Sequence, residues 1–202
     1  SPSGPTTITV TVTDNGNTNS GIGDDNSISI EFDIEVTPVN DEPIIDLVSD
    51  PAAILEDALE QTINLTGIGD GDPELTQTLS VTVTSSDTDI IPDPTVNYTP
   101  NSATGSLTYT PVADANGTAT ITVTVTDDGN TDGGVGDDNS YSISFDVEVT
   151  PVNDEPISDN QSLIAIEDIE KSITLTGSDG DPELTQTLTY ILTALPSTGT
   201  LS

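Results

Sequence analysis

The chain has 202 residues, of which 36 are acidic and only Lys171 is basic, so its formal net charge is -35. So strong a negative charge repels nucleic acid phosphates and anionic lipid headgroups, and we expect neither a nucleic acid partner nor membrane insertion of this segment. The chain contains no Cys, His or Arg, which removes most catalytic side chains, and we do not expect an enzyme.

An internal repeat organises the chain. Residues 6–44 align without a gap with residues 119–157, and both copies end in the same letters, Val36–Pro43 and Val149–Pro156. Within these proline-flanked acidic stretches we place a first hinge at 39–43 and a second hinge at 152–156. A second block follows each hinge, because Gly71–Leu79 recurs as Gly180–Leu188.

Apolar residues alternate with Thr or Ser along most of the chain, a period of two that predicts β-strands with one buried face. No stretch longer than a turn has the period of a helix. In chain order, we expect the last two strands of one repeat in 1–38, a complete β-sandwich in 44–151, and the first strands of a further repeat in 157–202. The chain is thus predicted to be all-β, with tandem immunoglobulin/cadherin-like Greek-key sandwiches. The strands expected in the complete repeat span 44–56, 60–66, 77–84, 94–98, 105–110, 118–126 and 140–150.

Strands that alternate in direction place every second turn at the same end of the domain. This rule gathers acidic residues and asparagines of distant turns at the two hinges, beside those of the hinges themselves. At the first hinge they are Asn40, Asp41, Asp70, Asp72, Asp127, Asp128, Asp137 and Asp138. At the second hinge they are Glu56, Asp57, Asp114, Asn116, Asn153, Asp154, Asp179 and Asp181.

Such gatherings of like charge need a counterion. Two unit charges 4 Å apart repel by about 4 kcal/mol at an effective dielectric near 20, and one Lys cannot neutralise two junctions. Ca²⁺ takes six to eight oxygen ligands from carboxylates, amides and main-chain carbonyls, in a flexible geometry. An acidic surface that merely keeps the protein hydrated would also account for the charge, but acids clustered at fixed positions favour calcium.

These residues, in this order and spacing, resemble the cadherin-like tandem repeats of large bacterial surface proteins and RTX-type adhesins. The resemblance implies that calcium between successive domains is held by Glu56, Asp70, Asp72, Asp127, Asn40 and Asp41, and in the later copies by Glu167, Asp179, Asp181, Asn153 and Asp154. The chain departs from the animal cadherin hinge at Pro38 and Pro151, where an Asp is usual, so we expect one or two ions per junction.

The resemblance implies an extracellular protein at the cell surface, and we expect a calcium-rigidified spacer, stalk or filament segment. The alternative is a module that binds carbohydrate or another ligand on an acidic surface protein, which predicts an aromatic cluster on one sheet face. The segment Gly133–Asp138 fits a calcium-binding β-roll motif, but it stands alone and is better interpreted as an acidic loop.

The two ends of the chain complement each other. Residues 1–36 supply the last strands of a sandwich and residues 157–202 supply the first ones. We therefore expect the partner to be a neighbouring repeat of the same or an identical chain, joined by strand complementation. The alternative is that the two ends are arbitrary boundaries within a repeat array.

Overall fold

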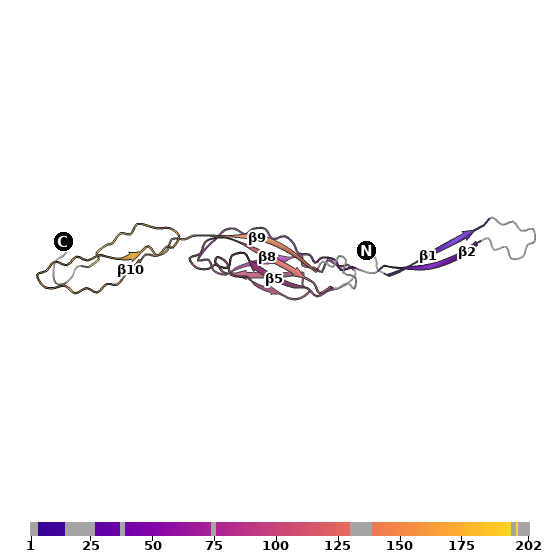
Figure 1. Cartoon of the computed structure of the whole chain (residues 1–202), viewed down its shortest axis with the longest axis horizontal. Coiled ribbons are helices and arrows are strands. Elements are labelled where there is room, and N and C mark those ends of the chain that lie inside the picture. Colours follow the sequence, from indigo (N-terminus) through magenta and orange to yellow (C-terminus); the bar gives the residue numbers. More distant parts are fainter. Residues whose placement is uncertain are drawn as a thin grey trace, which may run out of the picture.

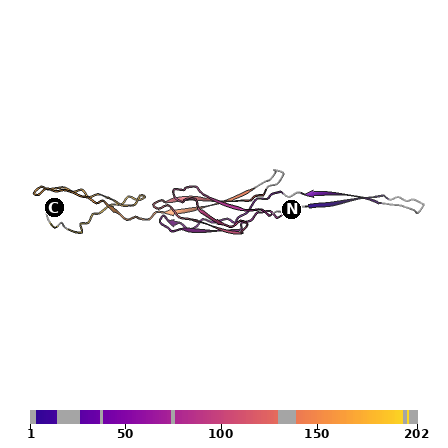
Figure 2. The ribbon, with the colours of Figure 1, turned by 90° about the horizontal axis from the view of Figure 1, so that it is seen from below.

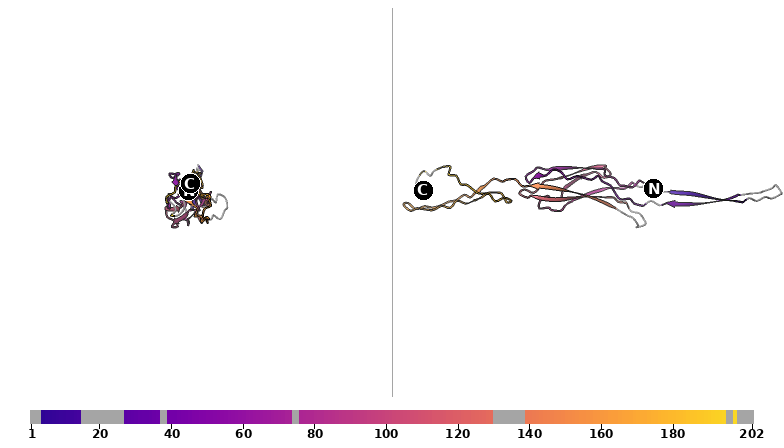
Figure 3. Two further views of the ribbon diagram at one scale, coloured as in Figure 1. Left: turned by 90° about the vertical axis from the view of Figure 1, so that its left-hand side faces the viewer. Right: turned by 90° about the horizontal axis from the view of Figure 1, so that it is seen from above.

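The structure is a computed structural model that describes residues 4–14, 27–36, 39–73, 76–129, 139–194 and 197. The molecule is elongated, with a β-hairpin at one end, a sandwich in the middle and an extended C-terminal segment at the other end (Figure 1). The same narrow shape is seen from below in Figure 2 and from the end and above in Figure 3. Every described element is a β-strand, so the prediction of an all-β chain is confirmed for these residues.

Two packed sheets form the central sandwich. The first sheet has the order β3-β9-β8-β5, with β3 spanning Ile54–Leu55, β9 Ser140–Thr150, β8 Gly117–Thr126 and β5 Ser80–Ser85. The second has the order β4-β7-β6, with β4 spanning Gln61–Thr66, β7 Thr104–Tyr109 and β6 Thr95–Tyr98. Strand β3 runs parallel to β9, and the other pairs are antiparallel. The predicted sandwich is confirmed, while its assignment to the immunoglobulin or cadherin type remains a prediction.

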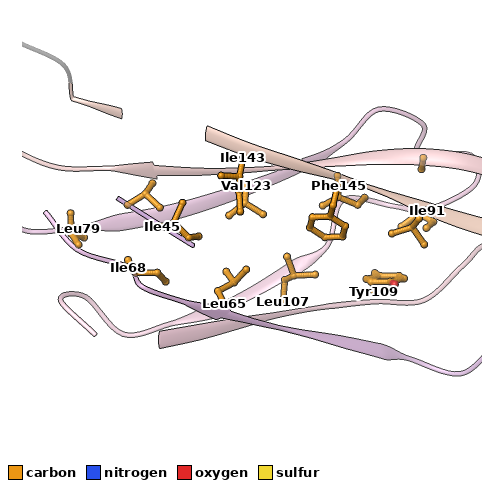
Figure 4. Close-up of a cluster of buried hydrophobic side chains, with 14 of the residues drawn as sticks. Ile45, Leu65, Ile68, Leu79, Ile91, Leu107, Tyr109, Val123, Ile143 and Phe145 are labelled. Atoms are coloured by element: carbon orange, nitrogen blue, oxygen red, sulfur yellow. The ribbon is translucent and has the colours of Figure 1, made fainter. Parts of the chain in front are cut away.

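The core follows from the alternation in the sequence. Strand β8 buries every second residue completely, including Ile121, Val123 and Val125, while the Thr residues between them point away from the core. Figure 4 shows Val123 and Phe145 of the first sheet facing Leu65 and Leu107 of the second. Because successive side chains of a strand point to opposite faces, a period of two is enough to bury one complete face.

The first predicted strand, 44–56, is wrong in length. Its start lies beside β4 of the second sheet, with a bridge between Ile44 and Gly69 and a hydrogen bond from the Asp46 N–H to the Thr66 main-chain oxygen. Its end is the short strand β3 in the first sheet. The segment thus crosses from one sheet to the other, and Pro51 between the two parts has no N–H to donate to a ladder.

The third predicted strand begins at Ser80 instead of residue 77. The N–H groups of Gln77, Thr78 and Leu79 donate to side-chain oxygens, and the acceptors are Asp70, Asp128 and Asn101 respectively. Side-chain acceptors therefore replace the start of the ladder, and they tie this segment to the neighbouring turns.

The two flanking segments contain few elements. Strands β1 (Gly4–Thr13) and β2 (Ser27–Val36) pair along their whole length as an antiparallel hairpin, and among the described strands they contact only each other. In the C-terminal segment, the described residues form only the short strands β10 (Ile157–Ser158) and β11 (Gly177–Ser178), which pair with each other. The predicted domain boundaries remain predictions.

Candidate functional site

The first hinge meets two turns of the sandwich through the side chain of Asn40. This side chain is 2% exposed, and its Nδ2 lies 3.5 Å from Asp127 Oδ1 and 3.4 Å from Asn139 Oδ1. Its Oδ1 accepts a hydrogen bond from Gln77 Nε2, which also lies 3.2 Å from Asp72 Oδ2. The structure thus brings Asn40, Asp72 and Asp127 together, as strand direction predicted.

Backbone amides satisfy other acids of this end. Asp70 Oδ2 accepts the N–H of Gln77 at 3.2 Å, and Asp127 Oδ1 accepts the N–H of Gly129 at 2.9 Å. The N–H of Thr78 holds the pKa of Asp128 below its ordinary value. Asp41 is exposed and makes no hydrogen bond to this group within the described residues, and Asp137 and Asp138 lie outside those residues. The centre of the first junction is therefore built from amide side chains as well as acids.

The second hinge repeats this arrangement. Gln186 Nε2 donates to Asn153 Oδ1 and lies 3.1 Å from Asp181 Oδ2, while the Gln186 N–H donates to Asp179 Oδ2 at 2.6 Å. These contacts correspond one for one to those of Gln77 at the first hinge. Two copies of the same sequence block therefore dock on their hinges in the same way.

A glycine between the two aspartates allows each block to lie against its hinge. Gly71 has a φ of 74° and Gly180 has a φ of 81°, in the left-handed region that favours glycine. A Cβ at Gly71 would collide with the main-chain oxygen of Glu42, and one at Gly180 would collide with that of Glu155. Both the turn and its close approach to the hinge thus depend on glycine.

A cluster of carboxylates lies at the second hinge, close to these contacts. Glu56, Asp154 and Glu183 each offer an oxygen, and the three oxygens lie within 4.8 Å of one another. Glu56 follows β3 in the sandwich, Asp154 belongs to the hinge, and Glu183 belongs to the C-terminal segment. We call these three residues the junction cluster, because each comes from a different part of the chain.

Each carboxylate of the junction cluster has one buried oxygen without a hydrogen-bond partner. Glu56 is 1% exposed, and its Oε1 accepts the N–H of Val152 at 2.6 Å. The other oxygen, Glu56 Oε2, is buried without a hydrogen-bond partner, and so are Asp154 Oδ2 and Glu183 Oε2. Buried acceptors of this kind are costly unless a donor or a cation meets them.

The pKa of Asp154 reflects the many negative charges around the second hinge. Burial raises the pKa of Asp154 above its ordinary value, and the neighbouring charges of Asp114, Asp57, Glu56 and Asp181 raise this pKa further. The structure therefore brings Asp57 and Asp114, both exposed and both predicted from their turns, close enough to act on the hinge.

The pKa values of two acids in the C-terminal segment are shifted in opposite directions. Burial raises the pKa of Glu183, and the charge of Glu56 adds to this effect. Asp181 instead accepts the N–H groups of Leu184 and Glu183, and these hydrogen bonds hold its pKa below the ordinary value. The hydrogen bonds to Asp181 thus favour its charged form, whereas burial favours the protonated forms of Asp154 and Glu183.

Sequence reasoning missed Glu183, Gln77 and Gln186. All three lie in the block that recurs as Gly71–Leu79 and Gly180–Leu188, so identity of letters beyond the two aspartates was the available signal. Glu167, which the family resemblance had suggested, is exposed and makes no hydrogen bond within the described residues. Its counterpart Glu56 is buried.

Comparison with known proteins gives distant structural matches. No family model and no curated protein matches the chain. A crystal structure of domains 4 and 5 of the S-layer protein SbsC is 20% identical, with a TM-score of 0.32, over 61% of this chain and 52% of that chain. Domains 1–6 of the same protein match at 15% identity and a TM-score of 0.32, over 78% of this chain and 18% of that chain.

An endo-fucoidan hydrolase from glycoside hydrolase family 107 matches at 17% identity, with a TM-score of 0.35, over 74% of this chain and 19% of that chain. The chain thus spans about half of the first of these structures and less than a fifth of the other two. In the described part of the chain, no helix has the length and apolar character needed to cross a bilayer.

Proposed function

We propose that this chain is a segment of an extracellular spacer or stalk, as in a large cell-surface adhesin, and that Ca²⁺ bound at the second hinge stiffens it. The observation that supports this proposal is the junction cluster. Three carboxylates from three parts of the chain converge there, and each keeps a buried oxygen without a hydrogen-bond partner.

The donor set is typical of a hard divalent cation. Every candidate ligand is an oxygen, from carboxylates of the cluster and of the nearby Asp57, Asp114 and Asp181. Ca²⁺ accepts six to eight such oxygens at variable angles, whereas Mg²⁺ demands a near-ideal octahedron and keeps several waters. Ligands from separate segments are better suited to the flexible geometry of calcium.

Binding at this place would couple the two parts that flank the hinge. An ion held by Glu56, Asp154 and Glu183 ties the sandwich to the hinge and the hinge to the C-terminal segment. Without the ion, the same carboxylates repel one another, and we expect the junction to be more flexible. We expect an affinity of about 10⁻⁴ to 10⁻³ M, the range of extracellular calcium modules.

Calorimetric titration tests the proposal at a single residue. Asp154→Asn keeps the size of the side chain and removes one charge from the cluster, so we expect calcium affinity at this site to fall at least tenfold. The matched control is Asp33→Asn, which removes the same charge from the exposed face of β2 in the hairpin. An absence of calcium binding to the unmodified chain, or equal affinity in the two variants, would contradict the proposal.

A carbohydrate-binding module, the alternative, has less support. A depression on the β4–β7–β6 sheet is lined by Leu65 and otherwise by small and polar residues, namely Asn64, Thr66, Asn97, Thr99, Thr104, Gly105 and Ser106. This lining offers no aromatic ring on which a sugar would stack, and Tyr98 packs its side chain against the core. The spacer therefore remains our conclusion.

A further inference from the structure

The hairpin at one end of the molecule exposes apolar side chains whose counterparts in the repeat form the core of the sandwich. Strands β1 and β2 match β8 and β9 almost letter for letter. Phe32 on β2 is 47% exposed, whereas its counterpart Phe145 on β9 is 3% exposed. The same contrast holds along this face of the hairpin, for Ile8, Val10, Val12, Ile30, Ile34 and Val36.

The C-terminal segment also exposes apolar side chains whose counterparts in the sandwich are packed into its core. Residues 171–176 correspond to β4 and residues 189–194 correspond to β5, but neither stretch forms a strand here. Leu175 is 56% exposed, whereas its counterpart Leu65 is 1% exposed, and Tyr190 and Leu192 are exposed as well. In the sandwich, β5 is held by pairing with β8, and the counterpart of β8 is β1 at the far end of the molecule (Figure 1).

We propose that the β1–β2 hairpin of one copy docks on the C-terminal segment of a second copy and takes the places there that β8 and β9 have in the sandwich. The central sandwich provides the template, since the same sequence blocks are packed there within one chain. Because the hairpin and the C-terminal segment lie at opposite ends of the elongated chain (Figure 3), the proposed contact joins two copies and does not fold back within one. An isolated two-stranded hairpin is at best marginally stable in water, so both copies gain from the contact.

The template fixes the register of the docked strands. In the sandwich, Val83 pairs with Val123 and Thr84 pairs with Thr122. Transferred to the flanking segments, β1 of one copy runs antiparallel to residues 189–194 of the other, and Thr9 lies opposite Thr193. The rows Val10 with Leu192 and Val12 with Tyr190 then turn their apolar side chains toward the new core.

Docking in this register also extends the second junction. Asp14 directly follows β1, as Asp127 directly follows β8. Asp127 lies beside Asn40 at the first hinge, so the Asp14 of the docked copy is placed at Asn153 of the second hinge. The contact is heterologous, with different surfaces on its two sides, and repetition of such a contact generates open filaments unless the rotation closes a ring.

Cysteine cross-linking tests the register, because the chain has no native cysteine. Residues directly opposite each other on antiparallel strands have Cα atoms about 4.5–5.5 Å apart, a separation that a disulfide accepts. We therefore expect an oxidised mixture of Thr9→Cys and Thr193→Cys chains to form a linked dimer. A mixture of Thr13→Cys and Thr193→Cys chains is the matched control, since these positions are about 13 Å out of register.

The outcomes separate docking in this register from nonspecific association and from the calcium proposal. In-register linkage should exceed the control several-fold both in calcium and in chelator, and Phe32→Asp in the hairpin chain should abolish it without lowering the melting temperature of the sandwich. Equal linkage in the two mixtures would overturn the proposal. So would an oxidised monomer from a chain carrying both Thr9→Cys and Thr193→Cys, because the hairpin would then dock on its own chain.

Discussion

Glu56 is the residue whose replacement separates the structural role of the junction cluster from its role as a ligand. Glu56→Gln keeps the size of the side chain and an oxygen that can accept the Val152 N–H, now 2.6 Å away, but removes the negative charge. Glu56→Ala removes both the charge and the acceptor. We expect both variants to lose calcium affinity at least tenfold, and only the alanine variant to destabilise the sandwich without calcium.

The size of the structural effect follows from the buried hydrogen bond. In Glu56→Gln the acceptor is neutral, and a neutral hydrogen bond contributes about 0.5–1.5 kcal/mol to stability; the side chain at this position is fully buried. For a domain of roughly 100 residues, 1 kcal/mol shifts the melting temperature by about 4–8 °C. In chelator, Glu56→Ala should therefore melt at least about 2 °C below Glu56→Gln.

Scanning calorimetry in chelator and in calcium provides the measurement. The unmodified chain should gain thermal stability from calcium, and Glu56→Gln should gain much less, although it equals or exceeds the unmodified chain in chelator. If Glu56→Gln were as unstable in chelator as Glu56→Ala, the hydrogen bond to Val152 would have no structural role. If calcium stabilised Glu56→Gln as much as it stabilises the unmodified chain, the charge of Glu56 would have no role in binding.

Three further predictions concern pH, the hinge glycine and the core. Burial raises the folded-state pKa of Asp154 and Glu183 above the ordinary values of 3.8 and 4.5, so the stability gained by protonating them is lost as pH rises through the raised values. In chelator, the melting temperature should fall as pH rises through these pKa values, and the lowered pKa of Asp181 should make the fall smaller. Saturating calcium should restore the melting temperature. Gly180→Ala should weaken calcium binding and speed hydrogen exchange of the Gln186 amide, whereas Gly4→Ala, also at positive φ but with no atom within 4 Å of the added Cβ, should do neither. Leu107→Ala should cost about 2–5 kcal/mol in denaturant unfolding, and the exposed control Leu184→Ala should cost less than about 0.5 kcal/mol.

The strands of the sandwich were predictable because their alternation is set by local geometry. Side chains such as Val123 and Ile143 are buried because they lie on the apolar face of their strands, and this face packs against the other sheet. The first strand was predicted too long because its path depends on two sheets at once. The crossing at Pro51 is a tertiary feature that a period of two does not encode.

The candidate site also contains residues that the sequence predicted and residues that it did not. Strand direction alone placed Asn40 beside Asp72 and Asp127, since the turns of alternating strands share an end. Glu183 and Gln186 were missed because their positions depend on how the turn at Gly180 folds back on the hinge. That turn needs a left-handed glycine in contact with the main chain, a contact between segments that residue spacing does not reveal.

Small-angle scattering tests the central claim most directly, because it measures whether calcium fixes the junction. The unmodified chain is measured in calcium and in chelator, at a concentration where light scattering gives the mass of a monomer, with Glu56→Gln as the control. We predict a single extended shape in calcium and a broader distribution of dimensions in chelator, and a much smaller difference for Glu56→Gln. The same maximum dimension and the same distribution of distances in both conditions would contradict the account.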